Sequence, residues 1–280
     1  MWPALADDLK SALDTPGEGL ARAALVIARL EYPRLDPAPF LDRLETLGRK
    51  AAARMGGADA AGRVAGLNAL LFEEEAFAGN DSQYDDPRNS CLNMVLDRRT
   101  GIPITLSVIY MDVARRAGLE LEGVNFPGHF LVRYQGESGS NLIIDPFHAG
   151  AVLSERDCRQ LLDRSHAELD FSPELLAPAS PRRIATRMLT NLKRLYLGMR
   201  SYAQAYAATD LLVALNPGSG DDLRDRGLLA YQMDDFGPAL RDLEASLTLT
   251  RRLGQDSPRS DQRLVWDHIK TLRRRLASLN

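Results

Sequence analysis

Two residues with complementary acid–base chemistry, His129 and Asp145, lie on either side of a turn-rich stretch. The glycines and serines of residues 136–140 indicate a turn that joins two strands of a hairpin. If residues 135 and 141 flank this turn, the residue numbers of each pair across the hairpin add up to 276. Leu131 then lies opposite Asp145, and His129 lies diagonally across from Asp145 on the same face. A diagonal spacing of roughly 7–8 Å between the backbones lets the two side chains meet. A histidine oriented by a carboxylate is the general base, with its orienting partner, of Cys-His-Asp catalysis.

The same pair admits two other interpretations. His129 can donate a hydrogen bond to Asp145 and lock the hairpin without taking part in any reaction. His148 follows Asp145 by three residues, so the three side chains together could hold a metal ion. We predict no metal site and no cofactor, because no short-spaced pair of ligands anchors such a set.

A nucleophile to accompany His129 is harder to identify. Thr105 and Ser107 lie near the start of a predicted helix, but Ser107 lies one turn below that start and projects from a face predicted to be buried. Cys91 and Cys158 each adjoin apolar residues, which favours buried structural thiols over reactive ones. The two cysteines form no C-x-x-C pair, so neither a disulfide framework nor a structural zinc site is predicted.

A polar loop, residues 79–90, carries candidates for ligand binding. Its side chains could rim a cleft over His129, and we take Arg88 and Asn89 as the binding candidates. Turn and capping chemistry is the alternative explanation of Asp86 and its neighbours, since Asp and Asn side chains commonly bond to their own backbone.

The segments that must position these residues are helical at first and rich in strands afterwards. The helix that follows Pro103 has almost no polar face, which indicates burial on most sides, and Gly118 ends it. Helices are predicted at residues 18–32, from 36 onward, at 59–77, 92–99 and 104–117, and strands at 121–126, 129–135 and 141–145. This order predicts an α+β fold.

The chain after the proline-rich stretch Ser172–Pro181 is predicted to be helical throughout, and the stretch itself to be a linker. At an offset of 34 residues, Tyr202 aligns with Phe236 and Ala205 with Ala239. This period resembles that of the tetratricopeptide repeat, a helix–turn–helix unit. The tail is therefore predicted to contain about two such repeats.

A last helix, about residues 261–279, is expected to close the repeats, because two repeats alone cannot bury a continuous core. Its basic residues are Arg263, Lys270, Arg273, Arg274 and Arg275. A solvated basic face is the ordinary explanation, and an acidic protein or peptide partner is the alternative. The expected partner of the tail is a protein or a peptide.

Four short runs together resemble one branch of a known superfamily. They are Asp86–Ser90, Gly101–Pro103, Phe126–Phe130 and Ile144–Phe147. In this combination the chain resembles the SirB-type branch of the transglutaminase-like superfamily, whose members typically join this domain to a tetratricopeptide tail. The resemblance implies a papain-like core with a helical N-terminal part and a small antiparallel sheet over residues 1–177, and an all-α repeat domain over residues 181–280.

The superfamily's nucleophilic cysteine opens a buried helix and is followed by a histidine and an aspartate on later strands. His129 and Asp145 match the latter two, as active or vestigial catalytic residues, but the cysteine falls on Pro103. Because a proline cannot act as a nucleophile, we expect a non-catalytic binding or regulatory protein, a pseudoenzyme. The alternative is a hydrolase or acyltransferase that uses His129 and Asp145 with an unidentified nucleophile or an activated water.

Composition limits the choice of partners. The 280 residues carry a formal net charge of -3, which offers no general attraction to nucleic acid or to anionic lipid. The first thirty residues include acidic positions and lack an uninterrupted apolar run, and no stretch of about 18 consecutive apolar residues occurs. We predict neither nucleic-acid nor membrane binding, and a cytoplasmic location.

Overall fold

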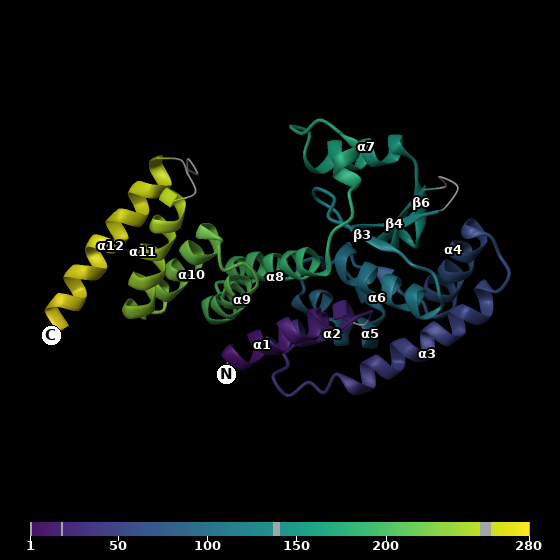
Figure 1. Ribbon diagram of the computed structural model, residues 1–280, viewed down its shortest axis with the longest axis horizontal. Helices are drawn as coiled ribbons and strands as arrows, with labels where there is room; N and C mark the ends of the chain where they lie inside the picture. The colour runs from purple at the N-terminus through teal and green to yellow at the C-terminus, as the bar shows by residue number, and fades with distance from the viewer. Residues whose placement is uncertain (1, 18, 137–140, 253–258, 280) are drawn as a thin grey trace. The chain divides into compact units, whose positions relative to one another are not determined.

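The structure, a computed structural model, describes residues 2–17, 19–136, 141–252 and 259–279. The chain forms two compact units, one of Asp8–Met188 and the other of Met1–Asp7 with Leu189–Asn280 (Figure 1). The first unit combines helices with a small antiparallel sheet, and the second is helical, which confirms the predicted α+β fold with a helical tail. The predicted helix start at Glu18 and four residues of the predicted turn, 137–140, lie outside the described residues.

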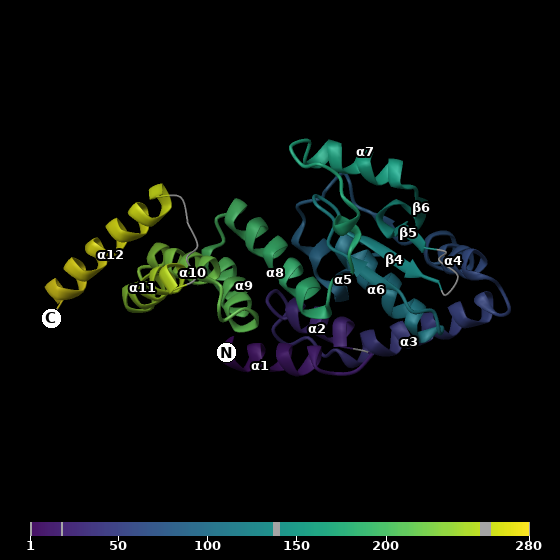
Figure 2. The same cartoon turned by 45° about the horizontal axis from the view of Figure 1, so that its top comes forward.

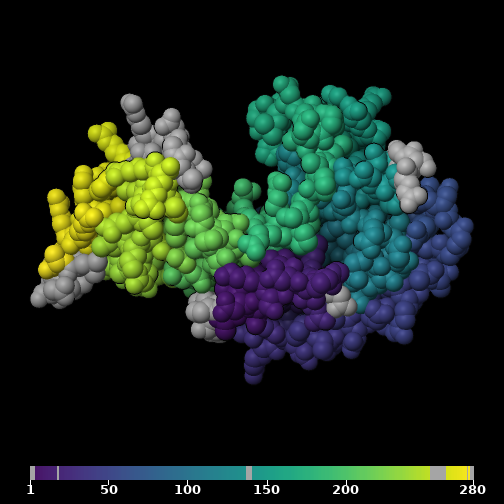
Figure 3. All heavy atoms as spheres, in the orientation of Figure 1, coloured from purple at the N-terminus to yellow at the C-terminus, as the bar shows by residue number. Residues whose placement is uncertain are grey.

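The described part of the chain begins with four helices, of which the second is buried on almost all sides and the others bury one face each. They are α1 (Trp2–Leu13), α2 (Gly19–Ala28), α3 (Ala38–Met55) and α4 (Ala60–Asn68). In the space-filling view, the blue surface of α3 and α4 forms the outer edge of the first unit (Figure 3). Helix α2 was predicted to end at Tyr32 but ends at Ala28. The backbone N–H groups of residues 29–31 bond to carbonyls three positions back, which tightens the chain ahead of Pro33.

The segment predicted as one helix over residues 59–77 changes type along its length. Asp59 caps α4 by accepting a hydrogen bond from the backbone N–H of Gly62 at 2.8 Å. The chain then continues as a π-helical turn, Ala69–Glu74, in which the N–H of Glu75 bonds to the carbonyl of Leu70 at 2.9 Å. Apolar spacing does not distinguish such a turn from an α-helix, so the sequence pattern predicted a helix without the change of type.

Helix α6 (Pro103–Arg116) is the centre of the first unit. Twelve of its residues, Pro103 to Ala114, are buried, as its apolar composition predicts. Asp112 is buried among them and forms ion pairs with Arg115 at 3.0 Å and Arg116 at 2.7 Å, so its charge is compensated inside the helix. A shorter helix, α5 (Leu92–Arg98), precedes α6. Two short strands, β1 (Ala78–Gly79) before α5 and β2 (Thr100–Gly101) after it, pair in parallel.

The main sheet has four antiparallel strands in sequence order. They are β3 (Glu122–Val124), β4 (Leu131–Gln135), β5 (Asn141–Asp145) and β6 (Ala151–Leu153). The β4–β5 register, from Gln135 opposite Asn141 to Val132 opposite Ile144, follows the predicted sum of 276. Strand β6 was not predicted, because three residues between a tight turn and a helix give no alternation to detect.

Helices cover both faces of this sheet. Helix α7 (Glu155–Ser165) and α6 lie on opposite sides of it (Figure 2). On the α7 side, Cys158 and Leu162 pack with Val124 and Leu131 of the strands. The sheet is therefore buried on both faces at Leu131 and Val132, whereas Val152 of the edge strand β6 is 53% exposed.

The proline-rich stretch Ser172–Pro181, predicted to be a linker, packs on the sheet instead. It contains a short 3-10 helix, Pro173–Leu176, and Pro178 then pairs with Val124 as an isolated antiparallel bridge. The N–H of Ala179 donates to the carbonyl of Gly123 at 2.8 Å. The frequent prolines predicted an irregular segment between the two halves. They did not predict that this segment would pair with the edge strand of the sheet.

The tail is a series of helices with the predicted period. They are α8 (Pro181–Gly198), α9 (Tyr202–Leu215), α10 (Gly220–Gln232), α11 (Phe236–Arg252) and α12 (Arg259–Leu279). Helices α9 and α11 begin 34 residues apart, at Tyr202 and Phe236, which confirms the repeat. Gly227 allows α10 and α11 to approach, because a Cβ there would lie 2.9 Å from Leu243. Among the described helices, none is long and apolar enough to cross a membrane.

The closing helix α12 contributes buried residues to the hydrophobic core of the tail. Leu272 is fully buried in a cluster with Val265 and Ile269, whereas Leu264 is 56% exposed on the same helix. We expect Leu272→Ala to lower the free energy of unfolding of this unit by about 2–5 kcal/mol, because it removes buried methyl groups and leaves a cavity. Urea unfolding followed by tryptophan fluorescence measures this, since both tryptophans, Trp2 and Trp266, belong to the unit.

Leu264→Ala is the matched control for this prediction. It deletes the same atoms from the same helix but from an exposed position, so we expect a change within about 0.5 kcal/mol. Equal losses in the two variants would contradict the packing of α12 as the closing helix.

Candidate functional site

His129 and Asp145 meet at one end of the sheet. His129 lies in the turn that precedes β4, and its Nε2 is 2.9 Å from both Oδ1 and Oδ2 of Asp145, the last residue of β5. Gly128 makes this turn with a φ of +67°, which glycine adopts without strain. The hairpin register therefore brings the two side chains together as predicted, although His129 lies just outside the strand in which the sequence placed it.

Asp145 has further donors on the turn that follows it. That turn is a 3-10 helix, Pro146–His148, in which the N–H of Phe147 donates to Asp145 Oδ1 at 3.0 Å. His148 Nδ1 lies 2.7 Å from Asp145 Oδ2. Two imidazoles and one backbone amide thus converge on a single buried carboxylate.

These partners set the ionisation of Asp145. Burial acts to raise the pKa of the carboxyl, but hydrogen bonds and positive charge from His129, and then from His148, outweigh burial and hold the pKa below its usual range. The carboxylate therefore stays charged at neutral pH. With Nε2 facing this carboxylate, Nδ1 is the His129 nitrogen that could accept a proton from another group.

Aromatic rings surround the pair. The His129 ring lies 5.9 Å from the ring of Phe147, edge to face, and 5.9 Å from that of His148, stacked at 25°. Tyr84, in the loop before α5, meets Phe147 at 6.3 Å. Sequence reasoning did not identify Tyr84 as a neighbour of the site, because a single tyrosine in a polar loop gives no signal of what it contacts.

The turn that carries His148 is fastened from the helical layer. Asn68 donates to the carbonyl of Gly150 at 2.8 Å and accepts from the hydroxyl of Tyr110 at 2.8 Å. Gly150 has a φ of +73°, and a Cβ added there would lie 2.0 Å from the Asn68 side chain. The turn is thus held by a close approach that only glycine permits. Sequence reasoning missed Asn68, since its helical position does not reveal a contact with a residue 82 positions away.

Pro103, the position on which the resemblance in the sequence placed a cysteine, is the buried first residue of α6. The hydroxyl of Thr105 completes this helix start: it accepts from the N–H of Ile102 at 3.2 Å and donates to the carbonyl of Asn89 at 2.7 Å. Ser107 is fully buried, and among the described residues its Oγ has no hydrogen-bond partner. Both hydroxyls are therefore inside the protein, and that of Thr105 is occupied.

The two thiols are buried as predicted. Cys91 is 1% exposed and Cys158 is 0% exposed, and both are unpaired. Burial, with added repulsion from nearby carboxylates, raises the pKa of Cys91 to about 12 and that of Cys158 to about 11. Since the thiolate is the nucleophile, neither side chain is poised for attack near neutral pH.

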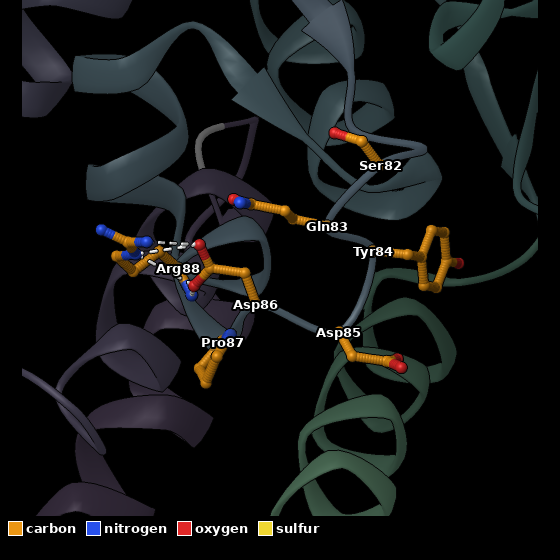
Figure 4. Close-up of a pocket in the computed structure, with 7 residues that line it drawn as sticks. All are labelled: Ser82, Gln83, Tyr84, Asp85, Asp86, Pro87 and Arg88. Atoms are coloured by element: carbon orange, nitrogen blue, oxygen red, sulfur yellow. Dashed lines mark hydrogen bonds and ion pairs between the residues drawn. The ribbon is translucent and has the colours of Figure 1, made fainter.

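The binding candidates of the polar loop have different surroundings. Arg88 is exposed and pairs with Asp86 at 2.7 Å, and the two side chains face each other on the wall of a surface pocket of about 470 Å³ lined by residues 82–88 (Figure 4). Asn89 is fully buried, and its amide donates to the carbonyl of Gln83 at 2.7 Å and accepts from Asn80 at 3.1 Å. Asn89 therefore shapes the loop from within, whereas a binding role of Arg88 stays a prediction.

The lowered pKa of Asp145 gives a prediction about acid stability. A carboxyl with a lowered pKa in the folded protein stabilises that state above its unfolded pKa of about 3.9, and this contribution is lost as the pH falls through the folded value. We expect Asp145→Asn to lower the free energy of unfolding by about 2–3 kcal/mol at pH 7, because it removes a charge that accepts several hydrogen bonds. Denaturant unfolding from pH 7 to pH 3 measures the difference.

The difference between wild type and Asp145→Asn should shrink below about pH 4, where the wild-type carboxyl itself becomes protonated. Asp157→Asn is a suitable comparison, because Asp157 also has a lowered pKa but its carboxylate is exposed and caps α7. A constant difference for Asp145→Asn over the whole pH range would contradict a charged carboxylate at the site.

Burial of both thiols predicts their reactivity. In the native protein at pH 8 we expect Cys91 and Cys158 to resist iodoacetamide, because burial both excludes the reagent and keeps each sulfur protonated. Mass spectrometry should find no adduct on the native chain and two adducts after unfolding in guanidinium. Rapid native modification of one cysteine would identify a reactive thiol and argue against this assignment.

The comparisons with known proteins agree with this architecture. Residues 38–190 match the family model described as transglutaminase-like superfamily, and residues 192–266 match that of the tetratricopeptide repeat. A UPF0162 protein of Xylella fastidiosa is 37% identical over 238 residues, which is 82% of this chain and 83% of the relative. Protein SirB1 of Salmonella typhimurium is 27% identical over 227 residues, 81% of this chain and 83% of its own.

Another kind of relative matches only part of the chain. F-box only protein 21 of Homo sapiens is 35% identical over 163 residues, which is 54% of this chain and 25% of that protein. No solved structure matches the chain significantly. The match over more than half of the chain, together with the UPF0162 and SirB1 relatives, shows that the chain belongs to the transglutaminase-like superfamily, as a SirB-type member with C-terminal tetratricopeptide repeats.

Proposed function

We propose that this chain is a non-catalytic, cytoplasmic binding protein, a pseudoenzyme that acts in regulation through a protein partner. Pro103 supports the proposal: it opens α6, where the resemblance to the superfamily implies a cysteine. A proline has neither a thiol nor a hydroxyl, so no side chain at this position can attack a substrate and accept its acyl group.

The surroundings of α6 support this proposal. The Thr105 hydroxyl is occupied at the helix start, and both thiols are buried and protonated. Ser107 is buried on a helix that is itself covered, where a substrate carbonyl has no access. Each residue type that could replace the cysteine nearby is therefore occupied, buried or both.

We assign the binding role to two parts of the chain, a transglutaminase-like domain over residues 1–177 and a repeat domain over residues 181–280. The five basic residues predicted on the closing helix divide into two groups. Arg273 pairs with Glu244 at 2.6 Å, Lys270 pairs with Asp267 at 3.6 Å, and Arg275 lies over the Phe236 ring at 5.2 Å, so these three are engaged within the tail. Arg263 and Arg274 are exposed and provide positive charge for an acidic segment of a partner.

A second function has one observation in its favour. The His129–Asp145 pair keeps the hydrogen-bonded geometry of a general base and its orienting carboxylate. A hydrolase or acyltransferase would use this pair with an unidentified nucleophile or an activated water. The two proposals differ in what the loss of the His129 imidazole should do.

Partner capture by variants of the full chain tests the first proposal. We expect His129→Ala to retain the partner within about twofold of wild type, because the imidazole is buried and takes no part in binding by the tail. The double variant Arg263→Glu/Arg274→Glu should lose at least about tenfold, since two attractive charges become repulsive. Quantitative affinity capture from the producing cells, with a purified partner then titrated, measures both.

The matched control is Arg34→Glu/Arg156→Glu, which makes the same change of net charge at two exposed arginines outside the tail. This control should bind like wild type. Turnover of a captured protein that depends on His129, or retention of a protein by His129→Ala only as an unprocessed substrate, would overturn the non-catalytic proposal in favour of the hydrolase.

A further inference from the structure

We propose that His129, Asp145 and His148 form a binding site for a divalent transition-metal ion of the zinc type. Each residue offers one ligand atom, and the three atoms lie within 4.8 Å of one another. This inference is independent of the proposed partner binding, since it concerns one end of the sheet and no residue of the tail.

The donor set suits such an ion. Two imidazole nitrogens and one carboxylate oxygen form a mixed N and O set, which zinc and its neighbours in the first transition series accept readily. Asp145 Oδ2 lies 2.9 Å from His129 Nε2 and 2.7 Å from His148 Nδ1. A tetrahedral ion with bonds of about 2.0–2.1 Å needs its ligand atoms about 3.3 Å apart. These two contacts therefore need to lengthen by about half an ångström, and the two nitrogens, which lie within 4.8 Å of each other, need to reach the same spacing.

The backbone holds two of the ligands on one short turn. Asp145 and His148 are three residues apart across the 3-10 helix, and this spacing supplies the pair that the sequence pattern alone did not identify as an anchor. The Phe147 amide holds Oδ1 of Asp145 at 3.0 Å, which leaves Oδ2 directed between the two rings. Hydrogen bonds behind a ligand in this way orient it and increase affinity for the metal.

Exposure and charge also fit a metal site. His129 and Asp145 are nearly enclosed, with side chains 8% and 3% exposed, whereas the His148 side chain is 57% exposed. An ion can therefore enter from the His148 side. Asp145 supplies a carboxylate oxygen, a ligand type that favours cations, and three protein ligands leave at least one coordination position for water or another molecule.

Without a metal, the same residues are a hydrogen-bonded cluster in which both imidazoles donate to Asp145. The two descriptions predict different behaviour on titration with Zn²⁺. A hydrogen-bonded cluster has no reason to bind one ion per chain, whereas a metal site binds one ion and loses affinity when any of its three ligands is removed.

Isothermal titration of the full chain with Zn²⁺, after treatment with a chelator and its removal, tests the proposal. We expect one Zn²⁺ per chain for wild type, and affinity lower by roughly 100-fold or more for His148→Ala, because loss of a direct ligand should cost at least as much as loss of its supporting hydrogen bonds. His148 is mostly exposed, so the variant keeps the fold, which circular dichroism verifies.

His166→Ala is the matched control. His166 is also a partly exposed histidine beside a carboxylate, with Nδ1 3.0 Å from Glu168, but it has no third ligand among the described residues. This variant should bind Zn²⁺ as wild type does. Absence of stoichiometric binding to wild type, or equal affinity in wild type and His148→Ala, would overturn the proposal, as would equal loss in both histidine variants.

Titration with Co²⁺ provides a second readout that does not depend on heat. We expect visible absorption bands of the intensity that four- or five-coordinate cobalt gives, and their loss in His129→Ala, Asp145→Asn and His148→Ala. The weak spectrum of hydrated cobalt in wild type would contradict coordination by these three residues.

Discussion

A buried carboxylate that must remain charged is the constraint on which the site end of the first unit depends. Asp145 is 2% exposed, and transfer of an unpaired carboxylate to such a place costs several kcal/mol. Its charge is tolerated because His129, His148 and the Phe147 amide all face it. The end of β5, the turn before β4 and the 3-10 helix are therefore placed so that all three donors reach the carboxylate, and Asn68 holds the next turn at Gly150.

Helix α6 imposes a second requirement, since its start is buried and its first amides need partners. Pro103 reduces the requirement by having no N–H, and Thr105 satisfies the amide of Ile102. The same hydroxyl reaches the carbonyl of Asn89, so the polar loop is attached to the helix start. Pro103 is thus a favourable residue with which to begin this buried helix.

The features that local chemistry determines could be predicted from the sequence. The β4–β5 register follows from turn residues and alternation, and the contact of His129 with Asp145 follows from the register. The 34-residue repeat is visible because it recurs. Contacts between distant segments could not be predicted, because nothing local encodes them: Asn68 with Gly150, Tyr84 with Phe147, and the packing of the proline-rich stretch on β3 are of this kind. The burial of Asn89 could not be predicted for the same reason, since a buried amide and an exposed one look alike in a polar loop.

Burial of both native thiols has a practical consequence for spectroscopy. Because Cys91 and Cys158 are enclosed and protonated at neutral pH, a cysteine introduced at an exposed position would be the one that reacts with a dye or a spin label. Labels could then be attached to chosen residues of each unit while the native cysteines stay in place. The natural chain is in this respect already a background suitable for distance measurements by fluorescence transfer or electron paramagnetic resonance.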